Sequence, residues 1–249
     1  MELLFGTIVL RPYVFGFLAA FLAAGAADLG WRRTLLFATG VWPVAWLAEF
    51  SSTRVGVPFG LYHYTGTTRG QELYIANVPF MDSLSFTFLA YAAFCLARAA
   101  LAGRRVSRLA LAGCTGFLMM LLDVVIDPLA VRGDRWFLGR VFYYPEGGVY
   151  FGVPLSNFAG WWLVGVIGVG AYLLAGGAGP APGDRRLGAG VALYYAVLGF
   201  NLAVTAWIDE WPLLGVGLAL HALSAVSLRV LRLSAERGGG FGTRGVESA

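Results

Sequence analysis

Two aspartates in one apolar stretch are the residues of this sequence best placed to do chemistry. Asp123 and Asp127 are four positions apart, so on a helix their carboxyl groups project from one face, one turn apart. Two carboxylates this close in an apolar setting repel each other, so we expect one of them to hold a proton near neutral pH. The spacing predicts a general acid or half of a metal site. The alternative is two acids at a wet helix end before Pro128.

A third acid, Glu49, begins a segment rich in glycine and tyrosine. Pro58 and the glycines around it predict an irregular or re-entrant path, which membrane proteins tolerate only around a cavity or inside protein. Tyr62 and Tyr64 alternate about His63, so their side chains share a face if this piece is extended. An aromatic belt at the membrane interface is the other interpretation of these residues.

A second aromatic run covers residues 135–162 and contains one acid, Glu146, and one amide, Asn157. Its composition is typical of the wall of a lipid-facing cleft. Asn157 precedes an apolar run, so it either caps a helix there or contacts a ligand. The pair Asp209 and Glu210 predicts a turn before the last apolar stretch.

The overall composition places these groups in a membrane protein. Of the 249 residues, 58% are hydrophobic and 13% are charged, and the mean hydropathy is +0.71, whereas soluble domains are about a quarter charged. All 18 basic residues are arginine, which excludes a Schiff base or nucleophile built on lysine. Two cysteines and two histidines are too few for the usual zinc or haem frameworks. The arginines lie between apolar runs, which indicates topology signals and no nucleic-acid partner.

Apolar stretches long enough to cross a bilayer must position the candidate residues. They are residues 10–27, 34–50, 83–101, 109–128, 158–176, 189–207 and 213–231. We predict an all-α, polytopic membrane protein with about seven transmembrane helices in one domain, residues 1–232. A flexible tail, residues 233–249, is expected to follow, and the first ten residues predict an interfacial turn before Arg11.

Charges are distributed unequally between alternate connections. Most arginines lie on one side together with the C-terminus, so that side is predicted to be cytoplasmic. Most acids lie on the other side, as do the two long aromatic-rich connections, residues 51–82 and 129–157. Connections this long are often functional, so the chemistry is expected on this acidic face.

These segments resemble a family of integral-membrane carotenoid biosynthesis proteins that includes carotenoid 1,2-hydratases and bisanhydrobacterioruberin hydratases. The resemblance extends roughly from the first predicted helix to the sixth. The matching segments are Arg11-Pro-Tyr13, Glu49, Gly56-Val-Pro-Phe-Gly-Leu-Tyr-His-Tyr-Thr65, Val78-Pro79, Asp123-x-x-x-Asp127-Pro128, Tyr144-Pro-x-Gly-Gly148, Tyr150-Phe-Gly-Val-Pro154 and Asn157-Phe-x-Gly-Trp161.

The resemblance implies addition of water to the terminal double bond of an acyclic carotenoid end, as in lycopene, γ-carotene or a bacterioruberin precursor. The product would be a tertiary alcohol, made with no cofactor and no metal. Asp123 or Asp127 would donate the proton, and Glu49 or Asp82 would hold the water. The expected substrate-binding residues are Phe59, Tyr62, Tyr64, Tyr144, Glu146, Tyr150, Asn157 and Trp161. Expected partners are a carotenoid from the bilayer, membrane lipid and other carotenoid pathway enzymes, in a bacterial or archaeal cytoplasmic membrane.

Three other functions fit the same residues. A cofactor-free carotenoid cyclase would begin with the same protonation and quench the cation with an internal alkene. A prenyltransferase or elongase would hold Mg²⁺ between Asp123 and Asp127 against a diphosphate. A carotenoid carrier or binding protein would need no acid. Product mass separates these functions, because hydration adds one water and cyclisation adds nothing.

Overall fold

Helices account for all seven apolar stretches of the sequence. The computed structural model describes residues 2–177 and 187–239, and within these ranges it has eight α-helices. They are α1 (Glu2–Leu10), α2 (Pro12–Asp28), α3 (Trp31–Val55), α4 (Phe80–Ala100), α5 (Arg108–Ala130), α6 (Leu155–Leu174), α7 (Leu187–Trp207) and α8 (Trp211–Gly239). The predicted all-α fold is confirmed.

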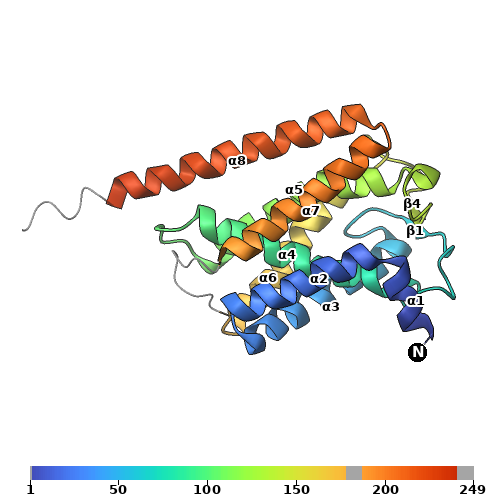
Figure 1. The fold of residues 1–249 in the computed structure, drawn as a ribbon, viewed down its shortest axis with the longest axis horizontal. Coiled ribbons are helices and arrows are strands. Elements are labelled where there is room, and N and C mark those ends of the chain that lie inside the picture. Colours follow the sequence, from blue (N-terminus) through green and yellow to red (C-terminus); the bar gives the residue numbers. More distant parts are fainter. Residues whose placement is uncertain (1, 178–186, 240–249) are drawn as a thin grey trace, which may run out of the picture.

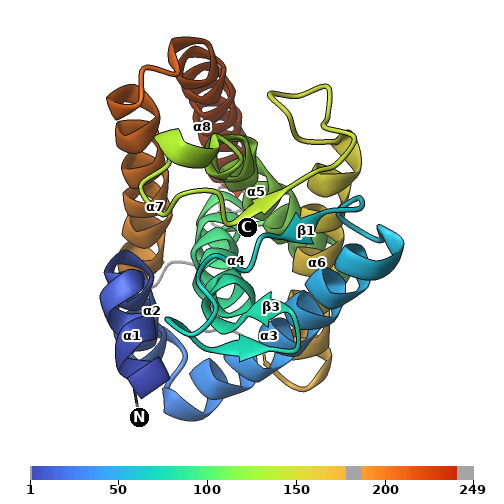
Figure 2. The same ribbon diagram turned by 90° about the vertical axis from the view of Figure 1, so that its right-hand side faces the viewer.

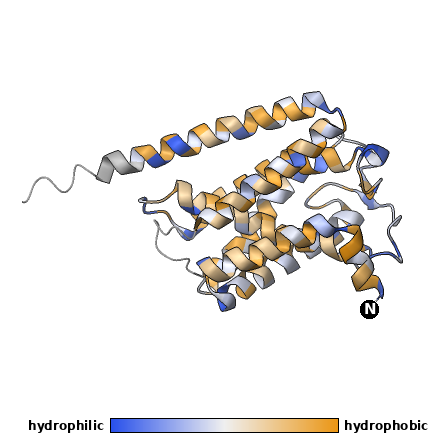
Figure 3. Ribbon diagram, viewed as in Figure 1, coloured by the Kyte–Doolittle hydropathy of each residue, from blue (hydrophilic) through white to orange (hydrophobic). Residues whose placement is uncertain are grey.

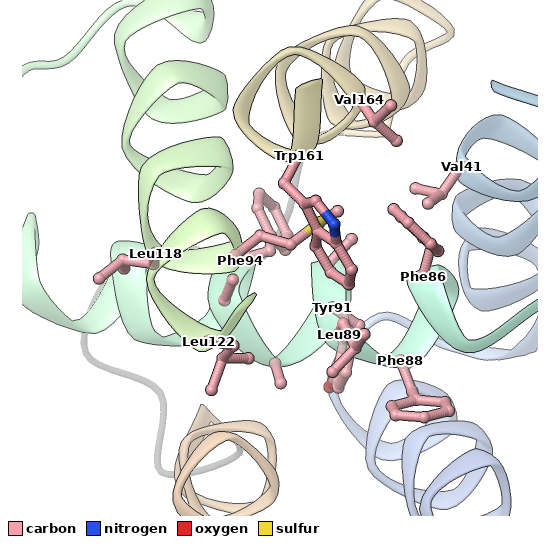
Figure 4. Packing of buried hydrophobic residues seen from close by; sticks show 14 of the residues in the cluster. Val41, Phe86, Phe88, Leu89, Tyr91, Phe94, Leu118, Leu122, Trp161 and Val164 are labelled. Carbon is pink, nitrogen blue, oxygen red and sulfur yellow. The ribbon is translucent and has the colours of Figure 1, made fainter. Parts of the chain in front are cut away.

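Helix α4 lies at the centre of the bundle, and α2, α3, α5, α6 and α7 surround it (Figures 1 and 2). Because neighbours cover it on all sides, α4 is apolar around its whole circumference and buried from Phe86 to Arg98. Figure 4 shows Trp161 of α6 reaching inward beside Phe86 of α4, with Val41 of α3 next to Phe86. The rings of Phe86 and Trp161 stack with centroids 4.3 Å apart.

The number of helices that meet a membrane-span criterion is smaller than the seven expected. Among the described residues, five helices are long and apolar enough to cross a bilayer, namely α4, α5, α6, α7 and residues Trp211–Ser234 of α8. Helices α1 and α2 are bent by 92° relative to each other at Arg11. Counted together as one broken span, they would add a sixth. Helix α3 falls short because the apolar stretch between Arg33 and Glu49 is shorter than the roughly 20 residues that a span requires.

Helix α8 lies along the outside of the bundle against α7 and α5 (Figure 1). Figure 3 shows that its surface, like that of the other helices, is predominantly apolar, while hydrophilic residues gather at helix ends and in the connections. The helix continues to Gly239, past the predicted start of the tail. Residues 240–249, Arg185 and Arg186 lie outside the described residues, so the flexibility of the tail and the arginine-based orientation stay predictions.

The two long connections lie side by side at one end of the bundle (Figure 2). Strand β1 (His63–Tyr64) pairs antiparallel with β4 (Phe142–Tyr143), and His63 is opposite Tyr143. A hairpin of β2 (Tyr74–Ile75) and β3 (Val78–Pro79) leads into α4, and a 3-10 turn, η1 (Gly133–Arg135), follows α5. The expectation that both connections share one face is therefore confirmed.

Glycines let α5 and α6 approach until their backbones touch. A Cβ atom on Gly116 would lie 2.5 Å from the carbonyl oxygen of Trp162, and one on Gly165 would lie 2.6 Å from the Cα of Gly116. Small residues permit this close packing between helices in lipid. This contact packs α5 directly against α6. It therefore places Asp123 and Asp127 opposite the first turns of α6.

Candidate active site

A cavity of about 150 Å³ lies below the paired strands β1 and β4, lined by residues of α2 through α7. Three acids from three different helices reach it, namely Glu49 of α3, Asp82 of α4 and Asp127 of α5. The rest of the wall is mainly aromatic. Its aromatic residues include Phe59, Tyr62, Tyr64, Phe86, Tyr144 and Trp161.

A shared hydrogen-bond donor holds the two aspartates of α5 together. The Nδ2 atom of Asn157 donates to Asp123 Oδ2 at 2.6 Å and to Asp127 Oδ2 at 2.8 Å. One turn further along α6, Trp161 Nε1 donates to Asp127 Oδ2 at 3.2 Å. Asp123 has no exposed surface and its Oδ1 atom has no hydrogen-bond partner among the described residues. The wet-helix-end interpretation of this pair is therefore wrong.

Asn157 acts through its side chain and does not cap its helix. Helix α6 begins at Leu155 after Pro154, and no side chain caps that end. Asn157 lies inside the first turn, 1% exposed, with its amide turned toward the aspartates. Of the two roles that the sequence left open for Asn157, the structure supports contact with the site.

The acids on the other side of the site differ in their charge partners. Arg11 donates to both carboxylate oxygens of Glu72, at 2.9 and 2.8 Å, and its third donor lies 2.5 Å from Asp82 Oδ1. Asp82 is therefore ion-paired, whereas Glu49 is 4% exposed and its Oε2 atom has no hydrogen-bond partner in the described part of the chain. Among residues 2–177 and 187–239, the ion pairs do not include Glu49, Asp123 or Asp127.

The tyrosines of the two connections form one cluster above these acids. As the alternation about His63 predicted, Tyr62 and Tyr64 both line the cavity, and their ring centroids are 5.4 Å apart. Tyr144 lies 5.7 Å from Tyr62. Burial and then the nearby Glu49 carboxyl raise the pKa of Tyr62 and Tyr64 well above its usual range. Burial and then Asp127 do the same to the pKa of Tyr144, so all three phenols stay neutral donors.

Most of the expected site residues meet at this cavity, and three do not line it. Phe59, Tyr62, Tyr64, Tyr144, Asn157, Trp161, Glu49, Asp82 and Asp127 line it. Asp123 lies behind Asp127. The expectation for Glu146 is corrected, because it is exposed in the turn after Tyr144. Tyr150 is also displaced from the cavity, since its hydroxyl donates to the Val124 carbonyl at 3.1 Å and its ring packs on Phe158.

Other polar residues of the acidic face have structural contacts. Glu210 pairs with Arg132 at 3.3 Å and with Arg135 at 2.5 Å, which fixes the turn that the sequence predicted before α8. No cluster of three or more His, Cys, Asp and Glu side chains able to hold a metal ion is present in the part of the chain that the structure describes.

Several cavity residues were not assigned a role from the sequence. Arg11 was considered there as a charge between apolar runs and as part of a matching segment, but it was given no role, although an arginine inside an apolar stretch is itself a signal of a buried partner. Its partner Glu72 is 1% exposed, which no local pattern reveals. Tyr13, Trp136 and Phe200 also line the cavity. Tyr13 belongs to a matching segment but was given no role, and nothing in the sequence separates Trp136 and Phe200 from the many other aromatic residues.

Comparison with known proteins identifies related chains. The family model described as "Carotenoid biosynthesis protein" matches residues 2–224. A curated relative, the bisanhydrobacterioruberin hydratase of Haloarcula japonica, is 32% identical over 167 residues, which are 67% of this chain and 51% of the relative. The chain thus matches about half the length of that relative. No solved structure matches the chain.

Proposed function

The chain belongs to the carotenoid biosynthesis protein family, and we propose that within this family it adds water to the terminal double bond of an acyclic carotenoid end. The observation that carries the proposal is the position of Asp127. Its carboxyl group, held by Asn157 and Trp161, reaches a small aromatic cavity that also contains Glu49. The hydratase relative supports the same class of reaction.

The first step is transfer of a proton from Asp127 to the less substituted alkene carbon, which leaves a tertiary carbocation at its neighbour. Asp127 is the better donor of the α5 pair because it lines the cavity and Asp123 does not. Asn157 and Trp161 both donate to the Oδ2 atom of Asp127, so the transferable proton belongs on Oδ1. Asp123 is a positioning residue that shares the Asn157 donor with Asp127.

The aromatic wall stabilises the cation. Faces of tyrosine, phenylalanine and tryptophan rings attract a positive charge, and the attraction is stronger where water is excluded. Tyr62, Tyr64 and Tyr144 lie above the acids, and Phe86 stacks on Trp161 beside Asp127. The three phenols remain protonated, so none of them acts as a base that takes the Asp127 proton before it reaches the alkene.

Water completes the reaction from the side of Glu49 and Asp82. The water oxygen bonds to the tertiary carbon, and the proton that it loses passes to one of these carboxylates. Asp82 has 20% of its side chain exposed and is held by Arg11, so it can exchange water with the loop end of the site. Transfer of that proton from the carboxylate back to Asp127 regenerates the enzyme, and no cofactor enters the balance.

Localisation and partners extend the proposal. We place the protein in a bacterial or archaeal cytoplasmic membrane with the C-terminus in the cytoplasm, because most arginines lie on that side. Its substrate comes from the bilayer, where it also meets lipid, and other enzymes of the same pathway supply that substrate and consume the product.

The test is expression in a bacterial host that accumulates lycopene, followed by mass analysis of the extracted pigments. We expect a product heavier by one water, made without added cofactor, and none from the empty host or from Asp127→Asn. A cyclised isomer of unchanged mass would indicate a carotenoid cyclase and contradict the proposed hydration. A longer product that requires Mg²⁺ would indicate a prenyltransferase or elongase. Unchanged lycopene, and unchanged γ-carotene and bacterioruberin precursor in matching hosts, would favour a carrier.

A further inference from the structure

The size of the cavity requires an opening for most of the substrate. At about 150 Å³ the cavity is smaller than the 300–1,000 Å³ of ordinary ligand pockets. A space of this size suits the end of an isoprenoid chain. The rest of a long polyene must therefore leave the cavity between two helices, toward the lipid.

Three of the seams between neighbouring helices offer no such passage. The backbones of α5 and α6 touch at Gly116 and Gly165. Helices α3 and α6 are similarly close, since a Cβ on Gly168 would lie 3.1 Å from the Cα of Val41. The seam of α5 with α7 is covered by a second apolar cluster, which consists of Leu129, Trp136, Val204, Ile208 and Leu213.

The seam between α2 and α7 is closed by aromatic side chains. Figure 2 shows these two helices as neighbours on one side of the bundle. Phe200 of α7 stacks on Tyr13 of α2, with centroids 5.2 Å apart and planes 15° apart, and meets Phe17 edge-on at 5.8 Å. Phe137, from the connection after α5, packs edge-on against Tyr13 at 5.3 Å. We call these four rings the aromatic seam.

The aromatic seam connects the cavity with the outer surface. Tyr13, Phe17 and Phe200 line the cavity, yet each is only half-buried. Phe137, which does not line the cavity, is 41% exposed. The glycines next to Phe17 and Phe200 in the sequence, Gly16 and Gly199, are exposed, and a Cβ on either would meet nothing within 4 Å. Aromatic rings can turn about their side-chain bonds without moving a backbone.

We infer that the aromatic seam is a lateral gate through which a linear isoprenoid chain slides from the bilayer into the cavity, end first. The inference rests on the proposed function and adds the path of the substrate to it. The chain end reaches Asp127 while the conjugated part lies between the rings of Tyr13 and Phe200 and continues into lipid.

The gate is tested by joining α2 to α7. Tyr13→Cys and Phe200→Cys are introduced together in a background carrying Cys95→Ser and Cys114→Ser, and a short, cleavable bismaleimide links them. Product formation from lycopene in liposomes is measured before linking, after linking and after cleavage of the linker. We expect linking to lower product formation at least tenfold and cleavage to restore it.

A matched control links helices at a seam that is already closed. Trp162 Nε1 donates to the Gly113 carbonyl across α5 and α6 at 3.2 Å, away from the cavity lining. Linking Gly113→Cys to Trp162→Cys in the same background should leave product formation within twofold of the unlinked protein. Equal product formation by linked and unlinked Tyr13→Cys/Phe200→Cys protein would overturn the gate.

A binding measurement separates failure of the gate from failure of the proposed function. Trp136 and Trp161 line the cavity, so a bound polyene quenches their fluorescence. One outcome is that the unlinked protein makes no hydrated product while lycopene still quenches its tryptophan fluorescence. If linking then abolishes the quenching, the result supports the gate and contradicts the proposed hydration. Quenching that is unchanged by linking would overturn the gate whatever the reaction.

Discussion

One amide nitrogen of Asn157 lies 2.8 Å from the carboxylate of Asp127, although 30 positions separate the two residues in the sequence. The same nitrogen lies 2.6 Å from Asp123. The geometry of the acid pair therefore depends on the packing of α5 against α6, which brings an i, i+4 pair on one helix opposite Asn157 and Trp161 on the other. Everything proposed for proton transfer follows from this arrangement.

The two aspartates should differ in their effect on turnover. We expect Asp127→Asn to lower product formation about 100-fold or more, because removal of a general acid typically costs 10²–10⁴ in rate. Asp123→Asn should cost less, since Asp123 does not line the cavity and an amide oxygen still accepts from Asn157. Product per hour in membranes with equal amounts of protein measures both. Undiminished turnover by Asp127→Asn would remove Asp127 as the essential acid.

The close approach of α5 and α6 should not tolerate a methyl group. In Gly116→Ala the new Cβ would lie 2.5 Å from the Trp162 carbonyl oxygen, so the helices must separate. We expect a loss of about 1–3 kcal/mol in stability, as for other overpacked sites, together with lower turnover as Asn157 moves from the aspartates. Thermal unfolding in detergent measures the first effect and product formation the second.

Gly113 supplies the control for this prediction on the same helix. A Cβ there would meet nothing within 4 Å. Gly113→Ala should therefore be neutral or stabilise the protein by up to about 1 kcal/mol, because alanine is the better helix former. Equal destabilisation by both substitutions would contradict the role assigned to the contact with Trp162, because the Cβ on Gly113 makes no such contact.

The sequence was most informative about structural features that depend on one segment of the chain alone. Apolar length predicted all seven helices, and alternation about His63 predicted the shared face of Tyr62 and Tyr64, because both depend on local periodicity. The spacing of Asp123 and Asp127 likewise placed both on one side of α5.

What the sequence could not supply were contacts between distant segments. The partners of Arg11 are 61 and 71 positions away, and their pairing depends on how the first long connection, residues 51–82, folds back against the end of α1. Glu146 lies in an aromatic run that suggested a ligand-binding wall, but the local turn points it to the exterior. The choice between Asp123 and Asp127 also required the three-dimensional position of the cavity.

The buried ion pair of Arg11 and Glu72 should show coupling in a double substitution. Arg11→Met leaves Glu72 buried without its partner, and we expect a loss of about 3–5 kcal/mol in stability. Replacing both residues by methionine should recover most of this loss, because an apolar pair of similar volume is often as stable as a buried ion pair. Turnover should remain low in the double variant, since Asp82 also loses Arg11.

Arg135→Met is the comparison for this pair. Arg135 pairs with Glu210 but has half of its side chain exposed, so its loss should cost no more than about 1 kcal/mol. Thermal unfolding of the wild type and these three variants in one detergent gives the comparison. A double variant no more stable than Arg11→Met would contradict the expected recovery.

The tyrosine cluster should give the protein a specific sensitivity to alkali. In the folded state the pKa of Tyr62, Tyr64 and Tyr144 is raised above the ordinary value of about 10, chiefly by burial. The folded protein thus holds these protons more tightly than the unfolded chain. The contribution is fully present below about pH 10 and is lost as the pH rises above it, because the unfolded chain then releases protons that the folded protein keeps.

We therefore expect the melting temperature to fall between about pH 9 and about pH 11 more steeply in the wild type than in Tyr62→Phe/Tyr64→Phe, which has no phenol to ionise at these positions. Tyr143→Phe, in the neighbouring strand and outside the cavity lining, should keep the slope of the wild type. Each variant is melted across the same series of buffers, so ionisation elsewhere in the chain contributes equally to all. Parallel curves for wild type and the double variant would mean that these phenols ionise as readily in the folded protein as in the unfolded chain, which would contradict the expected effect of burial on their pKa.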